Sequence, residues 1–187
     1  MDAEKSGIRR RLHDRLRATE PEERTAWSAA LRGHLLSSDR WREAGTVMLF
    51  AALRYEPDLI PLIEAAPEKR LVFPALENDL IVARAVHSPG DLEPAGHGIR
   101  EPAPKRCPAL PPQEIDLVLV PGLGFGRDGS RLGRGRGHYD RFLTTLPDTA
   151  LLCGTAFQCQ LSDALPAEGH DIPMHALLTE NGWLPFC

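Results

Sequence analysis

The sequence predicts one α/β domain with a mostly parallel central sheet, helices on both faces of the sheet, and a small antiparallel hairpin. Two observations carry this prediction. Runs of strand length at 46–52, 115–120 and 150–155 are apolar along most of their length, as in strands buried on both faces of a parallel sheet. Amphipathic stretches with helical spacing separate such runs. A chain of 187 residues has the ordinary size of one domain, so we expect residues 1–187 to fold as one unit.

The composition is that of a soluble globular chain, with 42% apolar and 26% charged residues. The net charge of −4 disfavours general binding of nucleic acids or anionic membranes, which usually requires a basic face. No run approaches the roughly 18 apolar residues of a spanning helix, and the charged N-terminus lacks the apolar core of a signal peptide. We therefore expect a cytoplasmic protein without nucleic-acid or membrane partners.

The first part of the chain predicts two helices. Residues 5–18 form a basic helix with one apolar stripe, made by Ile8, Leu12 and Leu16. Lys5 and Arg9 are four residues apart and therefore project from the same side of this helix. A second helix is expected to begin at Thr19, which caps it, with Glu22 completing a capping box.

The next part predicts a strand, a helix and two more strands, at 46–52, 58–66, 70–76 and 80–86. The last two strands are joined by a short polar turn and should form an antiparallel hairpin. Pro74 places its strand at or near a sheet edge, because proline donates no backbone hydrogen bond. Residues 87–113 are rich in proline and glycine and predict a long loop.

The segment between the run 115–120 and an amphipathic stretch at 138–146 is dense in glycine and arginine. We call residues 121–137 the Arg-Gly loop. It holds seven glycines (122, 124, 126, 129, 133, 135 and 137) and four arginines (127, 131, 134 and 136). Glycine lets backbone N–H groups approach a ligand, arginine supplies permanently charged donors that match phosphate oxygens, and a helix start adds unpaired N–H groups. This chemistry indicates a polyphosphate ligand.

Other interpretations of the Arg-Gly loop are weaker. Gly124, Gly126 and Gly129 have dinucleotide-binding spacing, but no helix opens at the third glycine and no suitable acid follows about 20 residues later. A P-loop fails because Ser130 and Arg131 stand where Lys and Ser/Thr belong. An RNA-binding Arg-Gly segment normally lies in a disordered tail, and a plain surface loop seldom has this composition.

The run R-L-G-R-G-R-G-H-Y-D from Arg131 to Asp140, preceded by P-G-L-G-F at 121–125, resembles the signature of 5-formyltetrahydrofolate cyclo-ligases. The resemblance extends over most of the chain, to Lys5 and Arg9 near the start and to 168–179 near the end. It implies the α/β fold described above and ATP-dependent conversion of 5-formyltetrahydrofolate to 5,10-methenyltetrahydrofolate, with release of ADP and phosphate. It also implies Mg²⁺ as the cofactor.

The resemblance further implies the residues of the site. ATP would be bound by Lys5, Arg9, Arg131, Leu132, Gly133, Arg134, Gly135, Arg136, Gly137, His138 and Tyr139. The folate would be bound by Ala51, Glu56, Arg134, Gly135, Arg136, Gly137 and His138. Arg134 and Arg136 would be catalytic, because they stabilise charge on the phosphates. Asp140 would hold Mg²⁺, which favours a carboxylate together with waters and substrate phosphates.

Two positions depart from the family pattern. His138 replaces the first aromatic residue of an aromatic–Tyr–Asp run, and His175 stands where the family usually has aspartate. Histidine is a poorer partner for Mg²⁺ than a carboxylate, so a ligand role for His175 is open, as is compensation by Asp171. The alternative is a non-catalytic relative that binds folate or nucleotide with a decayed metal site. His170 and Asp171 are not accompanied by a nucleophile motif, which argues against a hydrolase. We expect a monomer.

Overall fold

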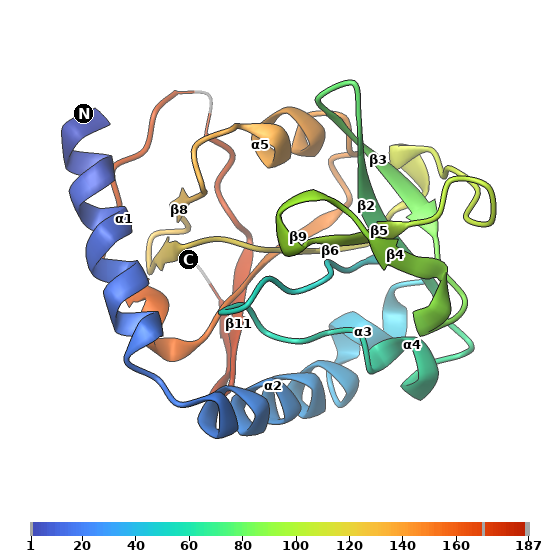
Figure 1. The fold of residues 1–187 in the computed structure, drawn as a ribbon, viewed down its shortest axis with the longest axis horizontal. Helices are drawn as coiled ribbons and strands as arrows, with labels where there is room; N and C mark the ends of the chain where they lie inside the picture. The colour runs from blue at the N-terminus through green and yellow to red at the C-terminus, as the bar shows by residue number, and fades with distance from the viewer. Residues whose placement is uncertain (1, 170, 186–187) are drawn as a thin grey trace.

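The computed structural model describes residues 2–169 and 171–185 and contains a seven-stranded sheet within them (Figure 1). Its strands are β1 (Thr46–Met48), β2 (Arg70–Glu77), β3 (Leu80–Ala85), β6 (Leu117–Val120), β9 (Leu151–Thr155), β11 (Ala176–Thr179) and β12 (Gly182–Pro185). They lie in the order β12-β11-β9-β6-β1-β2-β3. The pairs from β11 to β2 are parallel, and β3 and β12 are antiparallel at the edges. The predicted fold class and the predicted hairpin of β2 and β3 are confirmed.

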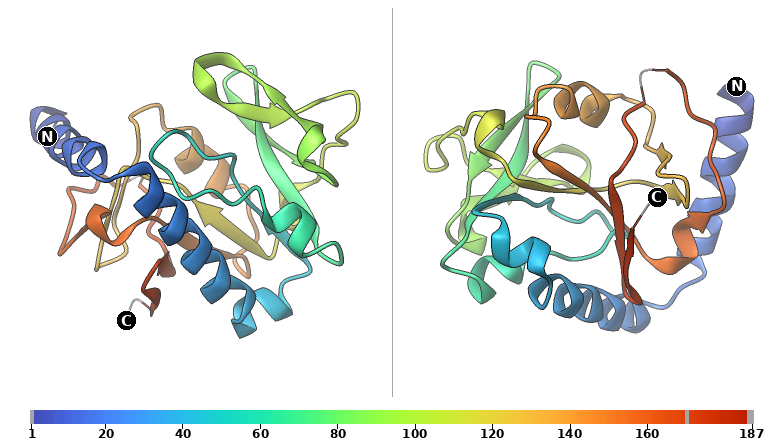
Figure 2. Two further views of the ribbon diagram at one scale, coloured as in Figure 1. Left: turned by 60° about the horizontal axis from the view of Figure 1, so that its bottom comes forward. Right: turned by 180° about the vertical axis from the view of Figure 1, so that it is seen from behind.

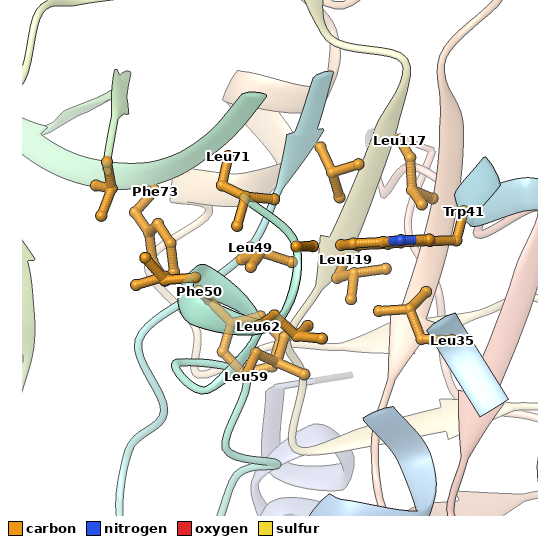
Figure 3. Packing of buried hydrophobic residues seen from close by; sticks show 14 of the residues in the cluster. Leu35, Trp41, Leu49, Phe50, Leu59, Leu62, Leu71, Phe73, Leu117 and Leu119 are labelled. Atoms are coloured by element: carbon orange, nitrogen blue, oxygen red, sulfur yellow. The ribbon is translucent and has the colours of Figure 1, made fainter. Parts of the chain in front are cut away.

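Three helices cover one face of the sheet and lie below the strands in Figure 1: α2 (Pro21–Leu36), α3 (Asp39–Glu43) and α4 (Leu62–Ala65). Val47 and Leu49 belong to the buried cluster on this face. Figure 3 shows the indole of Trp41, from α3, lying beside Leu35 of α2 and Leu119 of β6. The cluster therefore joins the helices to the middle of the sheet.

The opposite face is covered by α5 (His138–Leu143), which lies above the strands in Figure 1. Met48, between Val47 and Leu49, joins Phe142 and Leu143 of α5 in a second buried cluster. Successive residues of one strand thus enter different clusters, which is the period of two expected for a strand buried on both faces. The predicted placement of helices on both faces is confirmed.

The first helix, α1 (Asp2–Arg17), lies along one side of the molecule (Figure 2). Its predicted apolar stripe is used there. Leu12 is 2% exposed and packs with Leu132 and Leu165, with Ile8 beside them. This small cluster attaches α1 to the Arg-Gly loop.

Two strands of the Arg-Gly loop belong to a small sheet that the sequence did not predict. β7 (Gly124–Gly126) pairs antiparallel with β8 (Arg131–Leu132), and β10 (Leu161–Ser162) pairs parallel with β7. A Cβ atom on Gly124 would lie 2.4 Å from Leu12 Cδ1, so a side chain there would collide with α1. Part of the glycine content therefore serves close packing of α1 rather than an open loop.

Several predicted boundaries were wrong. α2 begins after Glu20, whose N–H donates to the Glu23 carboxylate, while the Thr19 hydroxyl donates to the Leu16 carbonyl at 2.7 Å. The strand predicted at 46–52 ends at Met48, and the helix predicted at 58–66 shortens to α4. The helix predicted at 138–146 ends at Leu143, three residues earlier than expected.

The predicted loop 87–113 has more structure than expected. It contains an antiparallel pair, β4 (Leu92–Pro94) with β5 (Arg100–Pro102). Short 3₁₀ segments occur in or at the end of this loop, at Pro89–Asp91, Gly96–Gly98 and Pro112–Glu114. A fourth, Gln158–Gln160, follows β9. Pro74 lies in β2 beyond the last residue that pairs with β1, so its missing N–H leaves no sheet partner unsatisfied. Within the described residues, every helix is too short or too polar to cross a bilayer.

Candidate active site

Two predicted site residues meet beside the carboxyl ends of β1 and β6. Arg134 Nη2 donates to Glu56 Oε1 at 2.8 Å, although the residues are 78 positions apart. The Glu56 side chain is 8% exposed, and its other oxygen accepts the N–H of Leu53 at 3.0 Å. Ala51 is partly buried at the start of the same segment and packs against the core below. Loops at the carboxyl ends of parallel strands are the usual place for a ligand site.

The end of the Arg-Gly loop has a backbone that requires glycine. Gly135 has φ of 96° and Gly137 has φ of 64°, both in the left-handed region. Between them, Arg136 is exposed, and none of the hydrogen bonds or ion pairs of the described residues involves its guanidinium. This stretch therefore presents a tightly curved backbone and an arginine side chain to solvent.

Helix α1 brings Arg9 to the Arg-Gly loop and Lys5 to two carboxylates. Arg9 Nε donates to the Gly133 carbonyl at 3.1 Å. One turn earlier, Lys5 is 7% exposed and its Nζ lies 3.0 Å from Glu168 and 3.1 Å from Asp171. Burial alone would lower the pKa of Lys5, but its bonds to these two carboxylates raise the pKa on balance. Lys5 therefore remains a cation in a shielded position against Glu168 and Asp171.

Arg131 and Asp140 form an ion pair behind the exposed part of the loop. Arg131 is 7% exposed, and its Nη2 donates to Asp140 Oδ1 at 2.5 Å. Its Nη1 reaches the carbonyl of Pro121, directly after β6, at 3.5 Å. The pair thus fixes the start of α5 against the carboxyl end of β6.

Tyr139 lies next to this pair. The Arg131 guanidinium is 5.9 Å from the centre of the Tyr139 ring. Within the described residues, Tyr139 Oη and Arg131 Nε are buried polar atoms without a hydrogen-bond partner. Burial raises the pKa of the Tyr139 hydroxyl, and the nearby charge of Glu56 adds to this effect. The hydroxyl is therefore a neutral donor close to the Glu56 carboxylate.

The carboxylate of Asp140 suits Mg²⁺ in its chemistry. Its Oδ1 is bonded to Arg131, while no hydrogen bond of the described residues uses its Oδ2. Those residues contain no group of three or more His, Cys, Asp or Glu side chains suited to a metal. A Mg²⁺ ion bound mainly through substrate phosphates and water needs only one or two carboxylates, so Asp140 fits that kind of binding.

His175 lies elsewhere in the sheet. It directly precedes β11, and its N–H donates to the Leu152 carbonyl at 2.8 Å. Its Nδ1 accepts the N–H of Leu152 at 3.2 Å, so this ring nitrogen is already occupied. The amino ends of β9 and β11 hold this residue, whereas the Arg-Gly loop leaves the carboxyl end of β6. His170 lies outside the described residues.

Sequence reasoning missed two residues that touch the predicted site. Asp79, in the turn between β2 and β3, lies 2.7 Å from His138 Nε2 through its Oδ1. Arg141 of α5 reaches both Asp79 and the carbonyl of Arg136. The sequence carries no signal for these contacts, because they depend on how the hairpin lies against α5.

Comparisons with known sequences identify the family. The sequence model of the 5-formyltetrahydrofolate cyclo-ligase family matches residues 1–180. The chain is 36% identical to a 5-formyltetrahydrofolate cyclo-ligase of Mycolicibacterium smegmatis, over 94% of this chain and 93% of the relative. It is 27% identical to the mouse enzyme of the same name, over 97% and 96% of the two chains.

Solved structures give the same result. The structure of Aquifex aeolicus 5,10-methenyltetrahydrofolate synthetase has a TM-score of 0.86 at 34% identity, covering 97% of this chain and 92% of that chain. A 5,10-methenyltetrahydrofolate synthetase from Mycoplasma pneumoniae, at 22% identity, shares the fold with a TM-score of 0.75, over 94% and 98% of the two chains. The resemblance seen in the sequence from Arg131 to Asp140 is thereby confirmed, and the chain belongs to the 5-formyltetrahydrofolate cyclo-ligase family.

Proposed function

We propose that this protein catalyses the ATP-dependent conversion of 5-formyltetrahydrofolate to 5,10-methenyltetrahydrofolate, with release of ADP and phosphate. Family membership supports the reaction. One observation supports the assignment of the reaction to this site: the Arg-Gly loop contacts both α1 and Glu56, which follows β1. Arg9 contacts Gly133, and Arg134 contacts Glu56, so a nucleotide region and a folate region would share one loop.

The reaction needs activation because a formamide oxygen is a poor leaving group. The formyl oxygen attacks the γ-phosphorus of ATP, the bond to the β-phosphate breaks, and ADP leaves. The neighbouring amine of the folate then attacks the formyl carbon and loses its proton to solvent or to the phosphate. The carbon–oxygen bond breaks, and phosphate departs as the ring closes. The protein therefore has to align two substrates and neutralise phosphate charge rather than supply a nucleophile.

We propose the following division of work. The backbone of Gly133 to Gly137 and the side chains of Arg134 and Arg136 bind the phosphates and stabilise their charge during transfer. Lys5 and Arg9 are proposed to contact the nucleotide from α1, and the Arg9–Gly133 contact supports this placement of the helix. The remaining proposed nucleotide contacts are Arg131, Leu132, His138 and Tyr139.

The folate is proposed to bind on the other side of Arg134. Glu56 would accept N–H bonds from the amino-pyrimidine edge of the pterin, with Ala51 as an apolar neighbour. The ion pair with Arg134 supports this role, because it holds the Glu56 carboxylate in place before substrate arrives. Arg134 would thereby link the two substrates.

Asp140 is the residue that would hold Mg²⁺, through the oxygen not bonded to Arg131. When bound, the ion would neutralise charge on the ATP phosphates. Asp171, whose carboxylate bonds Lys5, is the residue that we propose as a replacement for His175. We also propose that the chain acts as a cytoplasmic monomer without nucleic-acid or membrane partners. The net charge of −4 supports the absence of such partners.

An absorbance assay tests the proposal, because methenyltetrahydrofolate absorbs in the near ultraviolet. Mixing the protein with ATP, Mg²⁺ and 5-formyltetrahydrofolate should produce a rising signal that requires all three. Arg136→Ala should lower turnover at least about 100-fold, the effect of removing one transition-state charge donor. Arg127→Ala is the matched control, since Arg127 is an exposed arginine of the same loop outside the proposed contacts.

Each outcome has a definite meaning. Unchanged turnover in Arg136→Ala would remove Arg136 from the mechanism. Binding of folate and ATP by the wild type without any absorbance change would support the non-catalytic alternative instead.

A further inference from the structure

The turn between β2 and β3 reaches across to the Arg-Gly loop. Asn78 and Asp79 have φ of 50° and 64°, and Glu77 pairs with Leu80, so the hairpin has a two-residue turn of type I′ geometry. This turn directs the Asp79 carboxylate at α5. Asp79 Oδ1 lies 2.7 Å from His138 Nε2, and Asp79 Oδ2 accepts from Arg141 Nη2 at 3.0 Å.

Arg141 carries the connection from Asp79 into the loop. Its Nη2 also donates to the Asp79 carbonyl at 2.9 Å, while its Nη1 donates to the carbonyl of Arg136 at 3.2 Å. The Arg141 Nη1 atom lies 3.4 Å from the position that a Cβ on Gly137 would occupy. One guanidinium thus spans from the hairpin turn to the Arg136–Gly137 part of the Arg-Gly loop.

We propose that Asp79, His138 and Arg141 form a clamp that positions the Arg136–Gly137 backbone, and that Asp79 is therefore a positioning residue for the reaction proposed above. The kinetic predictions for the clamp rest on the proposed function, whereas the structural predictions do not. Asp79 and Arg141 are outside the proposed substrate contacts, and they act on the loop through its backbone. The effect of the clamp is to hold the loop in the conformation that binds phosphate before the nucleotide arrives, which lowers the cost of binding.

The clamp contributes little to the stability of the fold, so its role can be tested separately. The side chains of Asp79 and Arg141 are 72% and 46% exposed, and exposed ion pairs are weak in water. The hairpin is held by its paired strands, and α5 is held by the buried side chains of Phe142 and Leu143. Loss of the clamp should therefore free the loop without unfolding either element.

Asp79→Gly is the sharpest test of the clamp. It removes the carboxylate but leaves an Asn-Gly sequence, which is the preferred pair for a type I′ turn, so the hairpin should be preserved. Arg141→Ala removes the other half of the clamp and keeps a good helix-forming residue in α5. Asp148→Ala is the matched control, because Asp148 is exposed in a turn and no ion pair of the described residues includes it.

Limited trypsin digestion provides a readout that does not depend on activity. Trypsin cleaves after arginine, and the cleavage rate follows the fraction of time that a segment is open. Cleavage after Arg134 and Arg136 should rise about two- to fivefold in Asp79→Gly, the range expected for loss of an exposed ion pair. Cleavage after Arg127 should not change. An equal rise at Arg127, or no rise at Arg134 and Arg136, would overturn the proposal.

Steady-state kinetics of the same variants give the second readout. Asp79→Gly should raise the KM for ATP about two- to fivefold with kcat nearly unchanged, because it removes preorganisation rather than a transition-state contact. Asp79→Asn should restore part of the affinity, since its amide oxygen still accepts a hydrogen bond. The double variant Asp79→Gly/Arg141→Ala should resemble Arg141→Ala alone.

The kinetic and proteolytic results separate two kinds of failure. A wild type without activity would overturn the proposed function, while the digestion pattern would still decide whether the clamp exists. An Asp79→Gly variant with an unchanged KM for ATP, or one whose effect adds fully to that of Arg141→Ala, would overturn the clamp and leave the proposed function standing.

Discussion

Among the arginines of the Arg-Gly loop, Arg131 differs from Arg134 and Arg136 in its burial and in its partner. Arg131 is 7% exposed and paired with Asp140, whereas Arg134 and Arg136 are exposed. A buried guanidinium that loses its carboxylate is an unpaired charge in a poorly solvated place. Arg131 therefore has a structural task in addition to any contact with ATP.

Substitution of Asp140 should reveal this task. Asp140→Ala should lower the free energy of unfolding by about 3 kcal/mol, because it leaves the Arg131 charge buried and unpaired. The double variant Arg131→Met/Asp140→Leu should recover most of that loss while remaining inactive. Urea unfolding checks both values. A stable Asp140→Ala variant would show that solvent reaches Arg131 and that the pair is dispensable for the fold.

Glu56 allows the two substrates to be separated. Glu56→Ala should raise the KM for 5-formyltetrahydrofolate by about tenfold, the effect of losing a charged hydrogen-bond acceptor, and change the KM for ATP little. Glu64→Ala serves as control, because Glu64 is an exposed glutamate of α4. Equal losses for both substrates in calorimetric titrations would argue against the proposed division between Glu56 and the loop.

At the scale of elements, α1 is attached to the site by a small apolar contact. Leu12 packs with Leu132, and Gly124 leaves the space that Leu12 fills. Leu12→Ala should cost about 3 kcal/mol of stability and raise the KM for ATP more than that for folate, since Arg9 is carried by the same helix. Leu36→Ala, at an exposed leucine of α2, is the control. Equal effects on both substrates would show that α1 does not serve the nucleotide region specifically.

The sequence predicted these elements unequally well. The periodic apolar stripe of α1 and the continuous apolar run 115–120 identified their elements correctly. The small sheet of β7, β8 and β10 was missed, because its strands are only two or three residues long, which gives no period to detect. The capping residue was also wrong, since Thr19 and Glu20 are both able to cap and their competition is decided by local geometry.

The candidate site shows the same limit. The motif from Arg131 to Asp140 was visible in the sequence, but the motif alone could not distinguish the buried Arg131 from the exposed Arg134. Contacts between distant segments, such as Asp79 with His138, follow from the packing of the hairpin on α5 and have no sequence signal. The sequence likewise could not show that Lys5 pairs with Glu168, or that His175 Nδ1 accepts a hydrogen bond from Leu152.

The whole molecule is organised by one sheet with two buried faces. Neighbouring residues of β6 alternate between the cluster beneath α5 and the cluster above α2 to α4. Because both clusters share the same strands, we expect residues 1–187 to unfold as one domain. Scanning calorimetry should show a single transition whose calorimetric and van't Hoff enthalpies agree. Two resolved transitions would contradict this expectation.

The central claim is that the Arg-Gly loop, together with α1, binds the phosphates of ATP. A crystal structure with Mg²⁺ and a non-hydrolysable ATP analogue tests it most directly. We predict phosphate density within hydrogen-bond distance of the backbone from Gly133 to Gly137 and of the Arg9 and Arg136 side chains. Ordered nucleotide density at any other place on the molecule would contradict the account.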